Sequence, residues 1–391
     1  MKTFLNARLV LKDGLVRKGF LVEEGGSIIS TGDMAQAPSQ CGEIVDCKGH
    51  YLAPGFIDLH THGAGGYDFM DGSPEDIVGA ARASMAYGTT SLLPTTIACS
   101  DDDVYAFIDA YFQAKKTADN MPHLLGMHLE GPYFALDQKG AQPERYIRNP
   151  DPEHYMKILE YAKGEVRRWS LAPELPGSIE MADRLKGSGI LLSAAHTCAT
   201  YGQMKAAFEH GVTSLTHLYS GMSTIVRVDG HRKLGVVESA YLLDGLLAEI
   251  ISDGIHLPPE LLQLILRCKN HDEIFLCTDS MRGAGMPEGK YILGPKKGAY
   301  EVITEGGIAL LPDRSAFAGS IATTNRLVRV MVYQAGLSVW EAVKMMTLNP
   351  ARAVGLDGIV GSLEVGKRAD LVIFDEDISI QSVYVSGVKT K

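Results

Sequence analysis

Short apolar runs alternate with longer, more polar segments through the middle of the chain. The apolar runs predict β-strands over 55–60, 89–95, 123–130, 167–173, 190–196, 213–217, 247–253 and 273–278. The segments between and after them predict helices over 74–87, 101–117, 152–163, 178–187, 201–210, 234–244, 258–268, 322–335 and 338–347. Eight strands that alternate with helices are typical of a parallel (β/α)8 barrel, so we predict an α/β, TIM-like fold.

The two ends of the chain have a different pattern, with short β-type runs separated by turn signals. Phe20-Leu21-Val22 precedes the turn Glu24-Gly25-Gly26, and near the other end Leu371-Val372-Ile373-Phe374 is followed by Val383-Tyr384-Val385. We therefore predict that residues 1–52 and 353–391 pair into one small composite β-sandwich domain. Residues 53–352 then form the barrel domain.

The composition and net charge of the chain restrict the kinds of partner that we expect it to bind. The 391 residues are 46% hydrophobic and 21% charged, with a formal net charge of −10. This charge disfavours nucleic acid or an anionic membrane as the main partner. The six scattered cysteines predict reduced thiols rather than a disulfide between Cys41 and Cys47, and the first residues lack the apolar core of a signal peptide. We therefore expect a cytoplasmic protein.

Histidines and carboxylates recur where the predicted strands end. His60 and His62 close the first strand and point to the same face, because alternate residues of a strand do so. Later strands end near Glu130, His196, His217 and Asp279. Any one of these residues could cap a helix or bond a loop. Since the carboxyl ends of barrel strands meet at one face, the whole set predicts a metal site there.

The residue types of this set suit divalent metals. Glu130, His196 and His217 provide a His₂-Glu set with one open position, and the pair from the first strand is placed to hold a second ion that Glu130 bridges. Such ions lower the pKa of a water molecule and make it a nucleophile near neutral pH. Asp279 is placed to take a proton and pass it to a leaving group. Imidazole and carboxylate suit zinc, iron, manganese or cobalt, and we expect Zn or Fe, with two ions per chain.

Longer motifs surround these positions and cover most of the chain. They are His128-Leu129-Glu130-Gly131-Pro132, Leu171-Ala172-Pro173-Glu174, Ala195-His196-Thr197-Cys198-Ala199-Thr200, Thr216-His217-Leu218-Tyr219, Asp253-Gly254-Ile255-His256, Thr278-Asp279-Ser280, Ala318-Gly319-Ser320 and Asn349-Pro350-Ala351-Arg352. With the His-x-His pair, they resemble the amidohydrolase superfamily and, within it, the N-acetylglucosamine-6-phosphate deacetylase family. The resemblance implies hydrolysis of N-acetylglucosamine 6-phosphate to glucosamine 6-phosphate and acetate.

The resemblance also implies roles for individual residues. His60 and His62 match the branch of the family that binds two metals, Asp279 matches the catalytic acid/base, and His256 matches the histidine that polarises the acetyl carbonyl. The substrate contacts that it implies are Gln142, Ser220, Gly221, Arg232, His256, Ala318 and Gly319. Members of this family are commonly homodimers in which an arginine crosses the interface to the phosphate, and Arg232 matches that arginine.

Departures from the family pattern leave alternatives open. Lys233-Leu234 replaces the usual Glu-Pro, and Ser220 stands where asparagine is common, so the exact amino sugar is open. N-acetylgalactosamine 6-phosphate is the nearest alternative substrate. A cyclic-amide hydrolase would need a lysine as the metal bridge, whereas the fourth strand ends in Ala172-Pro173-Glu174. A barrel relative with a purely structural role would be expected to lose metal ligands, and this chain keeps them.

Overall fold

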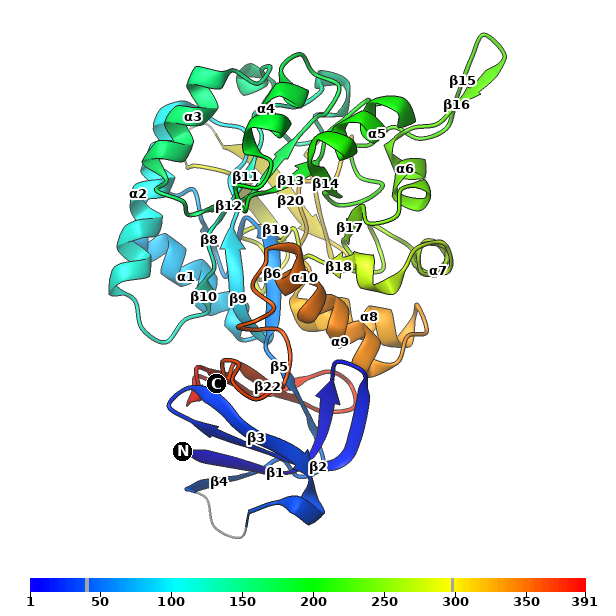
Figure 1. Cartoon of the computed structure of the whole chain (residues 1–391). Helices are drawn as coiled ribbons and strands as arrows, with labels where there is room; N and C mark the ends of the chain where they lie inside the picture. The colour runs from blue at the N-terminus through cyan, green and yellow to red at the C-terminus, as the bar shows by residue number, and fades with distance from the viewer. Residues whose placement is uncertain (39–41, 297–298) are drawn as a thin grey trace.

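The computed structural model describes residues 1–38, 42–296 and 299–391. Its larger part is built from parallel strands that alternate with helices (Figure 1). The strands are β6 (Phe56–Thr61), β9 (Thr89–Pro94), β10 (His123–Leu124), β11 (Met127–Glu130), β12 (Val166–Leu171), β13 (Leu191–Ala194), β14 (Val212–Leu215), β17 (Leu247–Ile250) and β18 (Ile274–Leu276). The helices are α1 (Pro74–Met85), α2 (Asp101–Thr117), α3 (Pro152–Tyr161), α4 (Ser178–Leu185), α5 (Tyr201–His210), α6 (Val236–Leu242), α7 (Pro259–Cys268), α8 (Thr324–Tyr333), α9 (Val339–Met346) and α10 (Leu348–Ala353).

The parallel strands form two sheets whose edges lie side by side. The larger sheet has the order β11–β12–β13–β14–β17–β18 and the smaller the order β10–β9–β6. Isolated parallel bridges join Thr95 to His128 and Thr61 to Ser280. Strands β6, β9 and β13 are buried along their whole length, as expected for parallel strands covered by helices. The predicted α/β fold is confirmed, whereas the closed (β/α)8 barrel stays a prediction.

The predicted elements of this region agree with the structure to within a few residues. Side chains mark several helix starts: Ser100 accepts a hydrogen bond from the N–H of Asp103 at α2, and Thr200 and Gln203 form a capping box at α5. The predicted strand 123–130 is divided into β10 and β11. The break lies at Gly126, whose φ of 141° takes the backbone out of the strand conformation. The apolar pattern does not predict the short helix α10.

Residues from both ends of the chain share one eight-stranded sheet, at the lower side of Figure 1. Its strands are β1 (Lys2–Leu11), β2 (Gly14–Glu24), β3 (Ser27–Asp33), β4 (Glu43–Asp46), β5 (Tyr51–Pro54), β22 (Leu371–Phe374), β23 (Ile380–Val385) and β24 (Val388–Lys389). The order is β24–β23–β22–β5–β1–β2–β3, with β4 beside β1. Strand β22 pairs antiparallel with β5, with Ile373 opposite Leu52. The sandwich and its boundaries at 1–52 and 353–391 stay predictions.

Smaller elements complete the described chain. They are the pair β7 (Gly63–Ala64) and β8 (Tyr67–Asp68), the hairpin β15 (Val226–Val228) and β16 (His231–Lys233), the sheet β19 (Gly289–Leu293), β20 (Tyr300–Glu305) and β21 (Ile308–Leu310), and the 3-10 helices Met34–Gln36, Leu136–Gln138, Glu144–Tyr146 and His271–Glu273. The β15–β16 hairpin projects away from the rest of the molecule (Figure 1).

Two further expectations concern cysteines and membranes. Cys47, Cys99, Cys198, Cys268 and Cys277 have free thiols, and Cys41 lies outside the described residues. Within residues 1–38, 42–296 and 299–391, no helix has both the length and the apolar character needed to cross a bilayer.

Candidate active site

Six side chains with metal-binding or acid–base chemistry meet where the parallel strands end. They are His60 in β6, His62 just after it, Glu130 at the end of β11, His196 after β13, His217 after β14 and Asp279 after β18. All six are buried. The structure therefore brings together all the residues that the sequence pattern predicts as metal ligands, together with the predicted acid/base.

Glu130 lies at the centre of this cluster. Its Oε1 is 3.4 Å from His60 Nε2, 3.4 Å from His196 Nε2 and 3.3 Å from His217 Nε2. Its Oε2 is 3.5 Å from His62 Nε2. One carboxylate thus faces a ring nitrogen of every histidine in the cluster, which is the arrangement that a bridging ligand needs.

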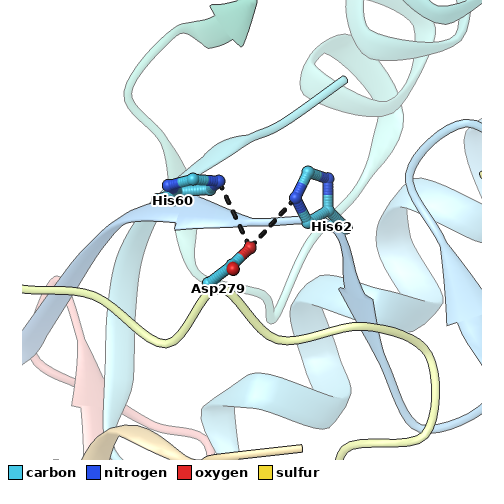
Figure 2. A group of neighbouring side chains, drawn as sticks. All are labelled: His60, His62 and Asp279. Carbon is cyan, nitrogen blue, oxygen red and sulfur yellow. Dashed lines mark ion pairs between the residues drawn. The ribbon is translucent and has the colours of Figure 1, made fainter. Parts of the chain in front are cut away.

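Asp279 faces the two histidines of the first strand (Figure 2). Its Oδ1 is 3.3 Å from His60 Nε2 and 3.1 Å from His62 Nε2. The ligand atoms of His60, His62 and Asp279 lie within 4.8 Å of one another, and so do those of Glu130, His196 and His217. We call these sets the first-strand group and the Glu130 group.

The charges of the cluster stabilise one another. Burial alone would raise the pKa of the Glu130 carboxyl, but His60, His196 and His217 hold that pKa well below its usual value. Burial lowers the pKa of His60, yet Asp279 and the other neighbouring carboxylates hold it well above its usual value. The buried carboxylates therefore favour positive charge around them. A bound divalent cation would supply that charge in place of protons on the imidazoles.

The donor atoms of the cluster fit a divalent metal. Nε2 of His60 is fully buried and has no hydrogen-bond partner among the described residues, although it points toward Glu130 and Asp279. Imidazole nitrogens and carboxylate oxygens are the ligands that zinc and iron take in hydrolytic sites. A buried polar nitrogen without a partner costs free energy unless a ligand satisfies it.

Three members of the cluster have a left-handed backbone. The φ angles are 44° at His196, 35° at His217 and 48° at Asp279. This region is sparsely populated by residues other than glycine and costs of order 1–3 kcal/mol at each position. Backbone hydrogen bonds hold the turn at Asp279, whose N–H donates to His60 O at 2.9 Å and whose carbonyl accepts from Ser320 N at 2.7 Å. The strand ends are thus bent so that these side chains face inward.

Neighbouring groups orient individual members of the cluster. His196 Nδ1 donates to the carbonyl of Gln138 at 2.8 Å, which leaves Nε2 toward Glu130. Gln142 Nε2 donates to Glu130 Oε2 at 2.7 Å, and Gln142 Oε1 accepts from Ala98 N at 2.8 Å. The structure therefore places Gln142 against the central carboxylate.

A cavity of about 320 Å³ opens above the cluster. Its lining contains most of the predicted site residues: His62, Glu130, Gln142, His196, His217, Ser220, Gly221, His256, Asp279 and Gly319. Ile97, Ala141, Tyr219, Leu293 and Phe317 add apolar and aromatic surface. A cavity of this kind, with charged groups at one end and apolar walls, suits a small polar ligand.

His256 lies on the wall of this cavity. Its Nδ1 bonds Asp253 Oδ2 at 2.9 Å, and Asp253 Oδ1 accepts from the backbone N–H groups of Ile255 and His256 at 2.8 Å each. The imidazole also packs on the Phe317 ring, with centroids 4.3 Å apart. These contacts fix the ring and leave Nε2 as the nitrogen available to a ligand.

Two predicted substrate contacts and one neighbouring glutamate do not line the cavity. Arg232 lies in β16 on the projecting hairpin and is exposed. Ala318 is fully buried and packs with Met281 and Leu293, next to the cavity residue Gly319. Glu174 accepts hydrogen bonds at 2.6 Å from Thr197 Oγ1 and from Cys198 N, so it braces the loop that follows His196.

The sequence analysis does not identify three residues that shape the site. Glu249 is a charged residue inside the otherwise apolar strand β17, and that mismatch is a signal which a strand-by-strand analysis could use. Arg168 lies in β12 next to a second arginine, Arg167, so the strand sequence does not single it out. Phe317 directly precedes the Ala318-Gly319-Ser320 motif but lies outside it. Its contact with His256 joins distant segments, so nothing local indicates it.

Known proteins resemble this chain over almost its whole length. Residues 51–389 match the amidohydrolase family. The chain is 36% identical to N-acetylglucosamine-6-phosphate deacetylase of Lysinibacillus sphaericus, over 87% of this chain and 85% of that one. It is 33% identical to N-acetylgalactosamine-6-phosphate deacetylase of Escherichia coli O157:H7, over 88% and 89%. The crystal structure of N-acetylglucosamine-6-phosphate deacetylase from Pasteurella multocida has a TM-score of 0.91 at 28% identity and covers 99% of both chains.

These matches agree with the chemistry of the cluster. Amidohydrolases are hydrolytic enzymes that use a divalent metal, and the first-strand and Glu130 groups are candidate ligands for it. The chain therefore belongs to the amidohydrolase family and, within it, to the N-acetylglucosamine-6-phosphate deacetylase family.

Proposed function

We propose that this enzyme hydrolyses N-acetylglucosamine 6-phosphate to glucosamine 6-phosphate and acetate. The observation that carries the proposal is the convergence of four histidines, Glu130 and Asp279 at the base of one cavity. The relatives named for this reaction support it. In the reaction the amide C–N bond breaks. Water supplies the hydroxyl of acetic acid and one proton to the amine, and the acid ionises to acetate.

We further propose two ions per chain, Zn or Fe. The Glu130 group would hold one ion, and His60 and His62 the other, with Glu130 bridging. When bound, such ions polarise the acetyl carbonyl and lower the pKa of the attacking water. The ligand chemistry supports this assignment because imidazole and carboxylate suit both metals.

Asp279 would transfer the proton, and His256 would hold the acetyl carbonyl. Asp279 is buried beside the first-strand histidines, where it would accept a proton from water and return it to the departing amine. His256 is fixed through Nδ1 by Asp253, so its other ring nitrogen would donate a hydrogen bond to the acetyl oxygen. Both residues line the same cavity, which supports a shared substrate.

The sugar ring and the phosphate would contact the remaining residues that line the cavity. Gln142, Ser220, Gly221 and Gly319 offer polar and backbone groups, and Ala318 lies directly beside Gly319. Arg232 would bind the phosphate, because guanidinium groups form charge-assisted, bidentate hydrogen bonds with phosphate. Since Arg232 lies on a projecting hairpin, we propose that it serves the cavity of a second copy in a homodimer.

We also propose the domain organisation of the chain and its location in the cell. The two parallel sheets would close into one (β/α)8 barrel over residues 53–352, which the bridges at Thr61 and Thr95 support. Residues 1–52 and 353–391 would form the β-sandwich domain, which the shared sheet supports. A phosphorylated sugar as substrate and free thiols are in keeping with a cytoplasmic location.

The test is acetate release from a panel of N-acetyl hexosamines, with and without a 6-phosphate. We expect the highest kcat/KM with N-acetylglucosamine 6-phosphate and a large loss without the phosphate. A preference for unphosphorylated sugars would contradict the role of Arg232. Absence of acetate release from every sugar would contradict the proposed reaction.

N-acetylgalactosamine 6-phosphate is the second candidate. A relative named for that activity is 33% identical over 88% of this chain. Ser220 is also one of the departures from the family pattern that leave the amino sugar open. The two substrates differ in the orientation of one hydroxyl group. The same panel separates them by their ratio of kcat/KM.

A further inference from the structure

Two oppositely charged side chains lie completely buried in the parallel strands, next to the candidate metal-binding residues. Arg168 in β12 and Glu249 in β17 are both 0% exposed. The Arg168 guanidinium donates through Nη1 to Glu249 Oε2 and through Nη2 to Thr216 Oγ1 at 2.9 Å. A buried ion pair gains little net stability over apolar side chains of the same volume. Its presence is better explained by the groups that it contacts.

Glu249 contacts one predicted ligand of the first-strand group and one of the Glu130 group. Its Oε1 accepts from His60 Nδ1 at 2.9 Å and from the backbone N–H of His217 at 3.0 Å. Because a carboxylate only accepts, Nδ1 of His60 carries the proton between them. Nε2 is then the His60 nitrogen that faces Glu130 and Asp279.

His60 is held differently from the other histidines of the cluster. His196 Nδ1 donates to a backbone carbonyl, that of Gln138. Nδ1 of His62 and Nδ1 of His217 have no hydrogen-bond partner among the described residues. A carboxylate on the far nitrogen orients a ligating imidazole and raises its basicity more than a neutral carbonyl does.

We propose that Glu249, held in place by Arg168, is a positioning residue for His60 and thereby controls binding of a cation by the first-strand group. The inference rests on the proposed function, because it assumes that divalent ions bind at the cluster. It assigns to a buried charge pair the task of fixing one imidazole ring. The Glu130 group keeps its own ligands and does not depend on Glu249 for their side-chain orientation.

The test compares metal binding by wild type, Glu249→Gln, the double variant Arg168→Met/Glu249→Gln, and Glu165→Gln. The double variant removes both buried charges, so no unpaired charge remains to unfold the protein. Glu165→Gln removes a carboxylate that bonds Tyr111 and Lys115 far from the cavity, and it serves as the matched control. The readouts are Zn²⁺ and Co²⁺ titration of the chelator-treated protein by calorimetry, metal content by mass spectrometry, and the melting temperature without metal.

We expect the affinity for one ion to fall about 10- to 100-fold in both Glu249 variants, as is typical when the outer partner of a ligating histidine is mutated. Glutamine keeps an oxygen that can accept from His60 Nδ1, but it lacks the negative charge that raises the basicity of the ring. The affinity for the second ion should change much less, because Glu249 contacts His217 through the backbone N–H and not through the ring. The Glu165→Gln protein should bind both ions as wild type does. Unchanged affinity for both ions would overturn the inference. An equal loss at both ions would also overturn it, because the proposed role is confined to the first-strand group. A lower melting temperature of the metal-free double variant would then indicate a purely structural pair.

The wild-type measurement separates this inference from the proposed function. If wild type binds a single ion, the two-ion proposal fails, and the Glu249 variants then decide only whether that ion depends on Glu249. A wild type that binds two ions but releases no acetate would contradict the proposed reaction and leave the difference between variants as the measure of the positioning role.

Discussion

The base of the cavity and the β15–β16 hairpin are built in opposite ways. The base gathers buried side chains from the ends of β6, β11, β13, β14 and β18, and hydrogen bonds hold each turn in place. The hairpin is a two-stranded sheet of its own, and its Val226, Val228 and Arg232 are exposed. One chain therefore contains the proposed groups for bond cleavage, whereas the proposed phosphate ligand, Arg232, lies outside the cavity of that chain. Changes at the base should act on turnover and changes in the hairpin on substrate binding.

Removal of metal should cause the largest loss of activity, and it should act only at the base of the cavity. Chelator-treated protein should lose at least about 10³-fold in kcat, because a metal contributes several kcal/mol of transition-state stabilisation. Added Zn²⁺ or Fe²⁺ should restore acetate release. The measurement pairs activity with metal content by mass spectrometry. Full activity in a protein shown to be free of metal would contradict a metal-dependent reaction at the base of the cavity.

Asp279→Asn should give the next largest effect. The amide cannot accept the proton from water, so kcat should fall roughly 10²- to 10⁴-fold, the usual contribution of a general acid/base. Metal content and KM should stay near the wild-type values, because the histidines and Glu130 are intact and asparagine keeps an oxygen that can face His60 and His62. Asp313→Asn, in the exposed loop after β21, is the matched control and should keep full activity. Wild-type turnover by Asp279→Asn would refute the acid/base role.

Arg232→Ala should give a smaller effect, confined to binding. KM should rise about 10- to 100-fold, the value of one or two charge-assisted hydrogen bonds to phosphate. Turnover at saturation should change little, because Arg232 would contact the phosphate and not the amide that reacts. Arg227 lies opposite Arg232 in the same hairpin, so Arg227→Ala is the matched control.

Mixed oligomers sharpen this last prediction. A hybrid of one Arg232→Ala subunit and one Asp279→Asn subunit contains one cavity with an intact Asp279 and an intact Arg232 from the neighbouring copy. Kinetics of co-expressed, purified hybrids should therefore show partial recovery of kcat/KM. No recovery, with dimers present, would place Arg232 in its own chain's cavity.

Much of the fold follows from local patterns in the sequence. The helix predicted over 101–117 is α2 with the same bounds, and the apolar runs before His60, His196 and His217 are strands. The cluster follows as well, because barrel topology brings the carboxyl ends of strands to one face. Both inferences need only periodicity and a topological rule.

Partners across the fold could not be predicted in this way. The contact of Glu249 with His60 and Arg168 depends on strand order and register, which periodicity does not specify. The same holds for Phe317 against His256, where a loop after β21 reaches the wall of the cavity. The break between β10 and β11 depends on a single glycine conformation, and an isolated glycine does not show which φ it adopts.

The sheet shared by both chain ends has a consequence for synthesis of the protein. Strand β5 is made before β22, its antiparallel neighbour, and the whole region of parallel strands and helices lies between them in the chain. Until then β5 presents a free edge, and its Leu52 lacks the contact with Ile373. Free edges of this kind recruit strands from other chains. The nascent chain thus keeps an aggregation-prone edge while the intervening parallel-strand region is made, and the edge is covered only when β22 arrives.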